Sequence, residues 1–558
     1  MSPVAAAQTA LAADRAHGDP AIWITRVPDA AVLERAHTLE AEGPGNRPLW
    51  GVPFAVKDNI DVAGLPTTAA CPDYAFTPAV SAPCVQRLLD AGAVLLGKTN
   101  LDQFATGLVG TRSPYGIPRN LFDPARVPGG SSSGSACAVA AGIVPFALGT
   151  DTAGSGRVPA AFGNIVGLKP TIGSVSGRGL VPACRSLDTV SVFARSVGEA
   201  LSVQRIIAGY DPDDVYSRRA PFPHLRRGPA PPALRVAMAD VAGLCDPATT
   251  ALYQRAAEAL GAATVNIALF LDVARLLYDG PWVAERCAAL RSVLKTRPDS
   301  LYPATRTILE SGLHRLAVDA FDAFHLLAKA KRALEDLFRR YDLLLLPTTP
   351  FCPSLAEVAA DPLEPNRRLG TFTNFANLCD LAGFAVPVGF GEDGIPVGVT
   401  LLGPAWSEGR LAGPADALHR RFSAAVPPAA CADPLAPDET ELFCIGAHMS
   451  GLPLNHQITT LGGRFLRTTH TEPAYRLHAL GNRPGMVRAA GGASIAGEVW
   501  AVPTAAIGAL LAQVPAPLGF GLADLQDGPC LSFLAEAAAV ADAPDITRYG
   551  GWRAWLAA

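Results

Sequence analysis

Residues 128–159, PGGSSSGSACAVAAGIVPFALGTDTAGSGRVP, form the stretch that decides the fold of this chain. Two Ser/Gly-rich turns enclose one apolar run, residues 136–148, which we expect to form a buried helix. Glycines allow tight turns that direct successive backbone N–H groups toward one point. A serine at the end of such a turn is placed as a nucleophile beside donors that stabilise an oxyanion. The alternative is a flexible linker, but linkers are not interrupted by hydrophobic stretches of helix length.

A serine nucleophile needs a base, and no histidine occurs between His37 and His224. Lys57 ends the apolar segment GVPFAVK, which has the character of a strand. Burial would lower the pKa of this lysine from about 10.4 and leave part of it as the neutral amine, which is a competent base. The alternative is a surface lysine at a strand end. The chain has six lysines beside forty arginines, so each lysine is of interest, because Lys can lose its proton at accessible pH and Arg cannot.

The bulk composition favours a large globular enzyme. A chain of 558 residues predicts about two to four domains. Apolar residues make up 49% and charged residues 17%, which supplies ample core and excludes global disorder. The net charge of −4 argues against nucleic-acid binding, since nucleic-acid binders usually carry a basic excess. A small-molecule substrate is therefore favoured.

The cysteines and the N-terminus indicate a cytoplasmic protein. Eleven cysteines occur as singletons without a CxxC pair or a Cys/His cluster, so we expect reduced thiols and no metal site. The first residues lack the basic-then-apolar order of a signal peptide. The apolar run 136–148 contains Pro145 and is shorter than the roughly 20 residues that a membrane span needs. We expect no membrane association.

The pattern along the chain predicts an α/β domain followed by a smaller one. Residues 49–97 alternate apolar runs with an amphipathic stretch, and strand-like runs recur at 234–239, 342–346 and 394–402, which indicates a mixed sheet with covering helices. Residues 426–439 are rich in Pro, Ala and Asp and are interpreted as a linker. After them, residues 440–558 contain short runs typical of strands: TELFCIGAHM, GGRFLRTT, YRLHAL, GMVRAA and GEVWAVP.

Four segments carry a family resemblance: GVPFAVKDN (51–59), PGGSSSGSA (128–136), GTDTAGSGRVPAAFGNIVGLKPT (149–171) and LLLLPTTP (343–350). Together they resemble the amidase-signature hydrolases over roughly residues 1–425. The resemblance implies a mixed central sheet covered by helices. Position by position, Ser155 matches the nucleophile, Ser131 the bridging serine that follows a cis peptide bond, and Lys57 the base. The spacing of 24 residues between the two serines agrees with the family pattern, and this resemblance selects Ser131 over Ser132 and Ser133.

The resemblance implies that neutral Lys57 accepts a proton from Ser131, which relays one from Ser155 as that oxygen attacks an amide. Backbone N–H groups from four consecutive residues would form the oxyanion hole: Thr152, Ala153, Gly154 and Ser155. Asp151 and Arg157 are expected to brace the loop, either as a structural ion pair or nearer the chemistry. Ala153 and Gly156 depart from the commonest family form, and Gly156 would enlarge the pocket.

The segment LYDGPWVAERC (277–287) and the last domain resemble the allophanate hydrolase branch of the family. Tyr278 and Arg286 match its substrate-binding residues. Allophanate is small and planar and ends in a carboxylate, which an arginine fork grips through two parallel hydrogen bonds. An exposed helix face is the alternative for this pair. Malonamate and biuret are the alternative substrates.

The C-terminal domain resembles that of allophanate hydrolases, which has a mostly-β γ-glutamylcyclotransferase-like fold. The resemblance implies that this domain promotes decarboxylation of an N-carboxycarbamate intermediate; the alternative is a docking or dimerising module without chemistry. It further implies a homodimer, no metal or organic cofactor, and a functional link to a biotin-dependent urea carboxylase. The candidate residues in this domain are His448, His456, Tyr475, Arg476 and Glu498.

Overall fold

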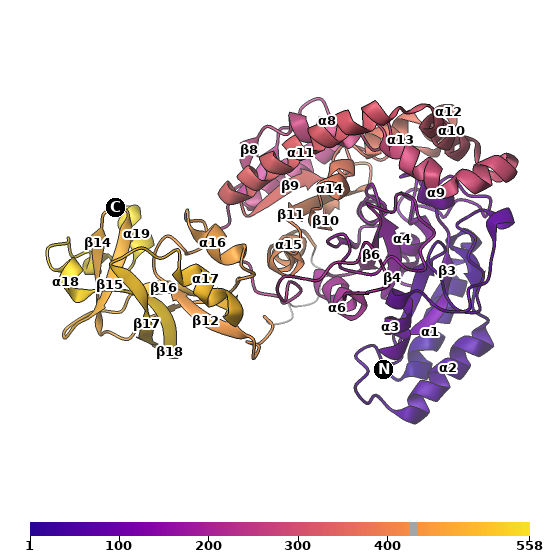
Figure 1. Ribbon diagram of the computed structural model, residues 1–558. Helices are drawn as coiled ribbons and strands as arrows, with labels where there is room; N and C mark the ends of the chain where they lie inside the picture. Colours follow the sequence, from indigo (N-terminus) through magenta and orange to yellow (C-terminus); the bar gives the residue numbers. More distant parts are fainter. Residues whose placement is uncertain (424–431) are drawn as a thin grey trace.

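The computed structural model describes residues 1–423 and 432–558. The larger of its two units is built on a mixed sheet of eleven strands, ordered β1-β3-β2-β4-β6-β5-β10-β11-β9-β7-β8 (Figure 1). Their bounds are β1 Trp23–Arg26, β2 Pro53–Lys57, β3 Val94–Thr99, β4 Phe146–Asp151, β5 Val166–Lys169, β6 Thr189–Ala194, β7 Val236–Ala239, β8 Ala263–Val265, β9 Leu343–Pro347, β10 Ala382–Phe390 and β11 Pro396–Gly403. Strand β2 runs parallel to β3 and β4, whereas β4 and β6 are antiparallel. The predicted mixed sheet and its strands at 234–239, 342–346 and 394–402 are confirmed.

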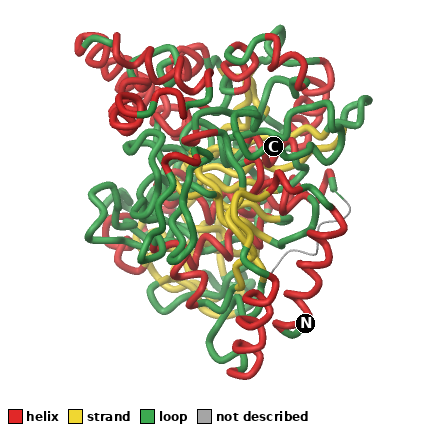
Figure 2. Tube along the Cα trace, turned by 90° about the vertical axis from the view of Figure 1, so that its right-hand side faces the viewer, coloured by secondary structure: helices red, strands yellow, loops and turns green. Residues whose placement is uncertain are grey.

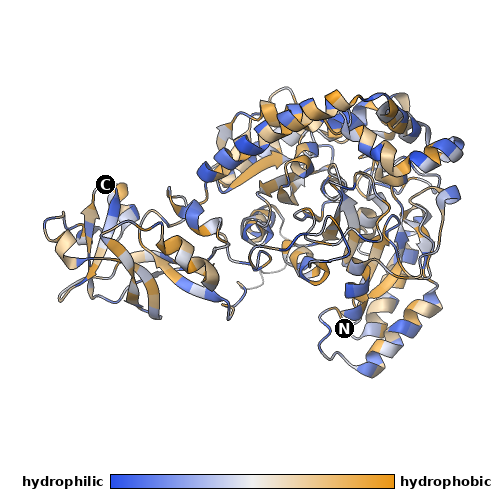
Figure 3. Ribbon diagram, viewed as in Figure 1, coloured by the Kyte–Doolittle hydropathy of each residue, from blue (hydrophilic) through white to orange (hydrophobic). Residues whose placement is uncertain are grey.

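Both faces of this sheet are buried. Along β2, Phe54 and Val56 enter one hydrophobic core while Ala55 enters the other, as the alternation of side chains in a strand requires. The helices therefore lie outside the strands, and the strands are largely hydrophobic (Figures 2 and 3). The helices of this unit are α1 Pro3–His17, α2 Asp29–Glu42, α3 Pro83–Asp90, α4 Ser133–Ala140, α5 Val158–Phe162, α6 Val197–Ile207, α7 Pro247–Ala259, α8 Ala268–Arg275, α9 Trp282–Thr296, α10 Pro303–Ser311, α11 Ala317–Arg340, α12 Leu355–Ala360, α13 Glu364–Leu369, α14 Asn374–Leu378 and α15 Glu408–Phe422.

The expectation of one buried helix over residues 136–148 is wrong. Helix α4 ends at Ala140, and β4 begins at Phe146. Gly142 lies between them with a φ of +71°, a left-handed conformation that ends a helix, and Pro145 follows. The apolar run thus contains the end of a helix, residues 136–140, and the start of a strand, residues 146–148, with a turn between them. Because of this break, α4 follows the first Ser/Gly turn and β4 leads into the second one.

The C-terminal unit is rich in strands. Its five-stranded sheet has the order β13-β16-β12-β18-β17, and β14 pairs with β15 in a second, two-stranded sheet. The bounds are β12 Glu439–Cys444, α16 Asn455–Thr459, β13 Arg464–His470, β14 Tyr475–Leu480, β15 Arg483–Arg488, β16 Ala496–Pro503, α17 Ile507–Leu511, β17 Leu518–Leu525, β18 Gly528–Ala535, α18 Ala537–Val540 and α19 Trp552–Leu556. The five predicted strand segments are confirmed, although the first strand stops at Cys444. The hairpin β17–β18 was not predicted.

The linker prediction for 426–439 falls partly outside the described residues. Its described part, 432–438, has no helix or strand, and Glu439 already belongs to β12. Buried Arg464 ties the two units together here: it donates to Glu439 Oε1 at 2.8 Å and to the carbonyl of Arg227, in the larger unit, at 3.1 Å. Within the described ranges, no helix has both the length and the hydropathy to cross a membrane.

Candidate active site

Lys57 is the last residue of β2 and is fully buried. Its Nζ donates to Ser131 Oγ at 2.7 Å and to Thr150 Oγ1 at 2.7 Å. By the alternation along β2, Lys57 points to the same side as Ala55, the side on which α4 packs, and Ser131 lies just before that helix. The predicted base and the predicted relay serine therefore meet. The surface alternative for Lys57 is wrong, because strand and helix together enclose its amine.

Burial lowers the pKa of Lys57 to about 7, although Asp102, Asp188 and Asp151 raise it in part. Near pH 7 a substantial share of this lysine is thus the neutral amine. A neutral amine can accept the proton of the Ser131 hydroxyl that it already contacts.

The turn before α4 holds Ser131 by its backbone. The Gly130–Ser131 peptide bond is cis, as the family resemblance implied. The carbonyl oxygen of Ser131 accepts a hydrogen bond from the Asp102 N–H at 3.0 Å. A Cβ on Gly130 would lie 2.1 Å from Asp102 Oδ2, so only glycine fits there. The carboxylate of Asp102 is fixed in turn by the N–H groups of Gly110 and Arg112, both at 2.9 Å.

Ser155 lies on the second Ser/Gly turn, and only 2% of it is exposed. Its hydroxyl makes no hydrogen bond to any described residue, so the contact between Ser155 and Ser131 that the proton relay needs is not formed here. The turn is braced by Asp151 and Arg157, which are both buried. Arg157 Nε lies 2.9 Å from Asp151 Oδ2 and Arg157 Nη2 lies 3.0 Å from Oδ1. Burial raises the pKa of Asp151, but the Arg157 guanidinium, together with Lys169 and the Gly156 N–H, outweighs this effect and holds the pKa below its usual range.

The backbone donors of this turn correct one prediction. The N–H of Gly154 donates to Asp151 Oδ1 at 2.9 Å, so it is already occupied and is not free for an oxyanion. The N–H groups of Thr152, Ala153 and Ser155 have no acceptor in the part of the chain that the structure describes. Gly154 instead serves the turn itself, since its φ is +126° and a Cβ there would lie 2.5 Å from Thr373 Oγ1.

Segment 373–377 supports the nucleophile turn, and the sequence alone did not reveal it. Thr373 Oγ1 donates to the carbonyl of Ala153 at 2.7 Å. Asn377 Nδ2 donates to the carbonyl of Asp151 at 2.9 Å, and its Oδ1 accepts from Arg157 at 3.0 Å. A threonine and an asparagine in a predominantly apolar stretch are the only signal, and nothing in the sequence pairs them with residues so much earlier in the chain.

Arg286, on α9, and Tyr278 meet as the sequence predicted, and the exposed-face alternative is wrong. Arg286 is fully buried, and its guanidinium lies 4.8 Å from the centroid of the Tyr278 ring. Its Nη1 makes one long hydrogen bond of 3.4 Å to Thr106 Oγ1. Arg286 Nε, Arg286 Nη2 and the Tyr278 hydroxyl are buried without a partner among the described residues. Buried donors without partners are costly, so this group indicates a place for a ligand with acceptor oxygens.

Asp188 connects this group to the nucleophile turn. Its carboxylate accepts the hydroxyl of Thr152 and, at 2.9 Å, the N–H of Ala183. Burial raises the pKa of Asp188 to about 6, while Thr152 and the guanidinium of Arg286 lower it in part. Arg286 is therefore close enough to act electrostatically on a carboxylate that itself holds the turn carrying Ser155.

A cavity of about 280 Å³ opens beside Tyr278. Asn374 also lines it: its Nδ2 donates to the carbonyl of Ala274 at 3.2 Å, which leaves its Oδ1 buried and without a partner in the described residues. The acceptor that this asparagine offers complements the hydroxyl of Tyr278, which lines the same cavity; Arg286 packs against Tyr278 but does not itself line this cavity.

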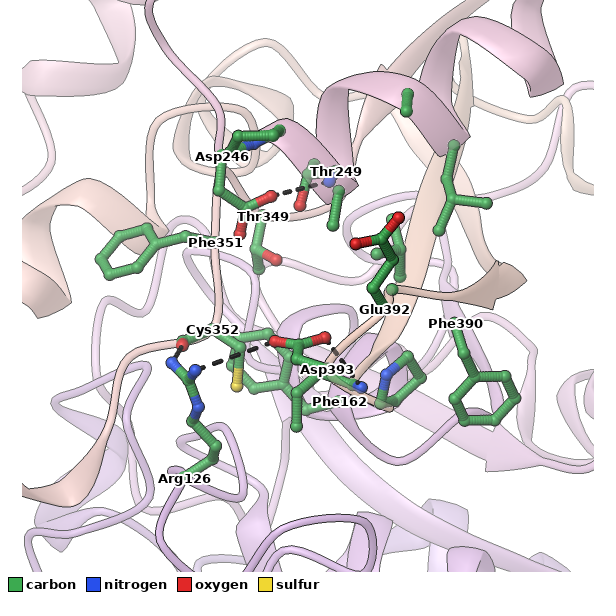
Figure 4. A pocket seen from close by; sticks show the side chains of 18 of the residues that line it. Arg126, Phe162, Asp246, Thr249, Thr349, Phe351, Cys352, Phe390, Glu392 and Asp393 are labelled. Atoms are coloured by element: carbon green, nitrogen blue, oxygen red, sulfur yellow. Dashed lines mark hydrogen bonds and ion pairs between the residues drawn. The ribbon is translucent and has the colours of Figure 1, made fainter.

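A larger cavity of about 810 Å³ lies elsewhere (Figure 4). Phe351 and Phe390 stand on opposite sides of it, and Arg126 faces Asp393 at 3.8 Å. Lys57, Ser131 and Ser155 line neither this cavity nor the one beside Tyr278. Its size alone does not connect it with the catalytic groups.

Two of the C-terminal candidates lie close together. Glu498 is buried, and its carboxylate accepts from the Ser450 N–H and hydroxyl, both at 2.7 Å, from Arg553 Nη2 at 2.5 Å and from Trp500 Nε1 at 3.1 Å. The carboxylate of the candidate Glu498 therefore braces the loop around Ser450, and its four hydrogen bonds do not favour a role in proton transfer. His448 lies two residues before Ser450 on the same loop.

The two histidine candidates have different surroundings. His448 Nε2 contacts Gln457 Oε1 at 2.9 Å, and its ring stacks on Phe533 with centroids 4.6 Å apart. Burial lowers the pKa of His448, so it is mostly neutral near pH 7. His456 Nδ1 contacts the carbonyl of Pro453 at 2.8 Å and faces the junction of the two units.

Tyr475 and Arg476 are separated from these histidines on β14. Tyr475 is fully buried, and its hydroxyl accepts from Arg488 Nη2 and from the Asp524 N–H, both at 2.8 Å. Arg476 lies on the opposite, exposed face, 3.8 Å from Asp545. The five candidates thus do not form one site.

Comparison with protein families gives two matches. A model described as Amidase matches residues 8–412, and a model described as Allophanate hydrolase C-terminal domain matches residues 440–557. The two matches fall on the two units of the fold.

Similar proteins cover both units. Urea amidolyase of Saccharomyces cerevisiae is 42% identical over 96% of this chain, and that of Lachancea kluyveri is 40% identical over 96%. This chain covers 31% of either protein, so it spans about a third of their length. The solved structure of Kluyveromyces lactis allophanate hydrolase is 39% identical, with a TM-score of 0.77, over 100% of this chain and 97% of that one.

Proposed function

Since this chain belongs to the amidase family and carries an allophanate hydrolase C-terminal domain, we propose that it hydrolyses urea-1-carboxylate (allophanate) to ammonia and carbon dioxide. One observation carries the proposal. A buried lysine with a pKa of about 7 contacts the Ser131 hydroxyl at 2.7 Å, and Ser155 occupies the neighbouring turn, whose N–H groups at residues 152, 153 and 155 have no acceptor among the described residues.

Ser155 Oγ attacks the terminal amide carbonyl of the substrate. Its proton passes to Ser131 Oγ, and the proton of Ser131 passes to Lys57 Nζ. For this relay the Ser155 hydroxyl must turn toward Ser131 when substrate binds. The oxyanion of the tetrahedral intermediate accepts from the N–H groups of Thr152, Ala153 and Ser155, which are free, and not from that of Gly154.

The proton on Lys57 then returns through Ser131 to the leaving nitrogen, and ammonia departs. This leaves an acyl-enzyme on Ser155. Water attacks the acyl carbon and loses a proton along the same relay, after which Ser155 is released and N-carboxycarbamate is formed. The intermediate loses carbon dioxide, and the remaining carbamate decomposes, so that one allophanic acid and one water give two ammonia and two carbon dioxide.

The carboxylate of allophanate fits the unpaired donors of the site. Arg286 Nε and Nη2 lie on one edge of the guanidinium and can hold both carboxylate oxygens. The Tyr278 hydroxyl supplies a further donor. Asn374 Oδ1 is the acceptor available for an N–H of the substrate. All of these atoms are buried and have no partner among residues 1–423 and 432–558.

Ammonia release from a panel of amides tests the substrate. The proposal expects the highest kcat/KM for allophanate, because malonamate lacks the central N–H and biuret lacks the carboxylate. A clear preference for biuret would contradict the role of Arg286 while leaving the amidase chemistry in place. A preference for malonamate would be consistent with carboxylate binding by Arg286, but it would contradict the proposal that allophanate is the substrate.

The C-terminal unit is proposed to promote decarboxylation of N-carboxycarbamate. Neutral His448 in its partly buried, polar loop is the candidate for proton transfer, and the bracing of the loop through Glu498 holds it in place. A chain ending at residue 423 tests this. We expect the first ammonia at an unchanged rate and a transient dicarboxylate visible by ¹³C NMR. If no intermediate builds up, the unit is a docking or dimerising module.

The setting of the reaction is also a proposal. We infer a cytoplasmic homodimer that works with a biotin-dependent urea carboxylase, the activity that would supply allophanate. The yeast urea amidolyases support the link, because about two thirds of their length lies outside the part that this chain covers. The ten described cysteines form no disulfide, in accord with a reducing compartment.

A further inference from the structure

A second group of cations lies at the junction of the two units, away from the catalytic residues. It lines a cavity of about 460 Å³ between α11, α15 and α16. Helix α11 contributes Lys331 and Arg339, α15 contributes Arg410, and α16 contributes His456 from the C-terminal unit. Figure 1 shows α16 on the side of the C-terminal unit that faces the larger unit. The proposed amidase chemistry assigns no role to these four residues.

Arg410 has no anionic partner among the described residues. Its guanidinium makes no hydrogen bond or ion pair with any residue that the structure describes, and its Nε is buried. Burial lowers the pKa of Arg410, and the charges of Asp342 and Glu408 raise it only in part. A desolvated charge of this kind is normally paired, since leaving it alone is costly. An unpaired guanidinium that lines a cavity is the arrangement expected of an empty anion site.

The carboxylates around the cavity are already occupied. Three acidic residues line it, and each is held by an arginine that does not line it. The pairs are Asp342 with Arg235 at 2.7 Å, Asp380 with Arg218 at 2.5 Å, and Glu335 with Arg332 at 3.2 Å. Lys331 has no ion pair among the described residues, and Arg339 meets only Asp336, at 3.8 Å. The cavity therefore keeps an excess of positive charge.

The cations on two walls of the cavity indicate a ligand with two charges. Lys331 and Arg339 lie on α11, and Arg410 lies on α15. A ligand with a single carboxylate, held by Arg410, would leave the cations of α11 without an anionic partner. We propose that the junction cavity binds a small dicarboxylate anion, one end of which is held by the planar fork of Arg410.

One species in the proposed reaction has this chemistry. N-carboxycarbamate carries a carboxylate at each end, so its capture between the amidase unit and the decarboxylating unit is a natural use of the cavity; this assignment rests on the proposed function. Malonate has a CH₂ where the intermediate has an N–H and is stable. It is therefore a suitable probe for the site, and its binding does not depend on turnover.

Isothermal titration of the full chain with malonate tests the proposal. We expect two sites, one at Arg286 and one in the junction cavity. Arg410→Gln should remove the second site or weaken it at least tenfold, and Arg286→Gln should remove only the first. Arg421→Gln is the matched control, because Arg421 lies on the same helix, is exposed and does not line the cavity. Thermal unfolding without ligand checks folding; an unpaired buried cation contributes little stability, so Arg410→Gln should not lower the Tm.

Each result bears on one proposal. Two undiminished sites in Arg410→Gln would overturn the junction site, as would equal weakening in Arg421→Gln. Binding of inorganic phosphate but not malonate at Arg410 would overturn the dicarboxylate assignment. If Arg286→Gln changes nothing while Arg410→Gln loses a site, the proposed substrate grip fails and the junction site stands.

Discussion

Lys57 Nζ and Ser131 Oγ lie 2.7 Å apart, although one ends a strand and the other precedes a helix much later in the chain. Their meeting depends on the parallel pairing of β2 and β4, which brings the end of β2 beside the Ser/Gly turns that flank α4 and β4. The closed surroundings remove water from the amine, and this loss of solvation lowers its pKa. The packing of β2 and β4 with the Ser/Gly turns therefore determines both where the Lys57 amine lies and how far its pKa is lowered.

The rate should depend on pH through Lys57. The neutral amine is the active form, so kcat/KM should rise with pH and reach half of its maximum near the pKa of about 7. The measurement is kcat/KM for ammonia release between pH 5.5 and 9. A profile that is flat across pH 7, with stable protein throughout, would mean that another group is the base.

Lys57→Arg should abolish turnover and leave the fold intact. Arginine keeps the positive charge but does not lose its proton at accessible pH, so the relay has no acceptor. We expect kcat to fall by about a thousandfold or more, in line with the loss of a catalytic base together with its relay. Circular dichroism and malonate binding should match the unmodified protein. Normal activity in this variant would exclude Lys57 as the base.

The same pKa predicts a pH-dependent stability. Lys57 titrates at about 7 when folded and at 10.5 when unfolded, so between these values the unfolded chain binds more protons and stability rises with pH. Below pH 7 the amine is protonated in both the folded and the unfolded chain, so the folded protein bears the full free-energy cost of burying this charge. Lys57→Met should therefore gain most relative to the unmodified protein at pH 6, and the gain should shrink by up to about 4 kcal/mol toward pH 10. Urea unfolding at both pH values measures it; a constant difference would contradict the burial of the charge.

The sequence predicts those parts of the candidate site that belong to short, continuous sequence motifs. Lys57, Ser131 and Ser155 can be proposed from the sequence because each lies in a compact motif whose residues are neighbours in the chain. Gly154 was misassigned because its N–H was counted as free, and only the fold shows that the Asp151 carboxylate accepts it. A backbone donor cannot be assigned until its possible partners are placed.

Thr373 and Asn377 were missed for a different reason. They reach the nucleophile turn only through the tertiary packing of α14 and the residue before it, which no local pattern encodes. The hairpin β17–β18 was missed because two glycines in LGFGLADL, Gly528 at the start of β18 and the partial exposure of β17 blur the alternation of polar and apolar residues. The end of the helix at Ala140 does have a local signal in the sequence, namely Gly142 and Pro145. The continuous hydrophobicity of residues 136–148 nevertheless led to the prediction of a single helix.

Arg286→Lys should weaken the grip on the substrate carboxylate. Lysine keeps the charge but loses the two parallel donors, so kcat/KM for allophanate should fall by about 10- to 100-fold. Biuret, which has no carboxylate, should lose much less. The control is Arg291→Lys on the exposed face of the same helix, which should leave both substrates unaffected. An equal loss on both substrates would indicate a role for Arg286 in the fold or in chemistry, and would contradict recognition of a carboxylate.

Thr373→Val should slow the chemical step through the backbone of the nucleophile turn. Valine keeps the shape but removes the hydrogen bond to the carbonyl of Ala153, at 2.7 Å, and that carbonyl is then buried without its partner. Ala153 carries one of the free N–H donors, so a shift of its peptide misaligns the oxyanion site. We expect kcat to fall by about tenfold, since whole-donor losses reach 100-fold or more, with KM little changed. Thr296→Val is the control, because its exposed hydroxyl contacts only the carbonyl of Ser292, one turn earlier on α9, at 2.9 Å. If KM rises and kcat holds, Thr373 shapes the pocket and does not align the donors.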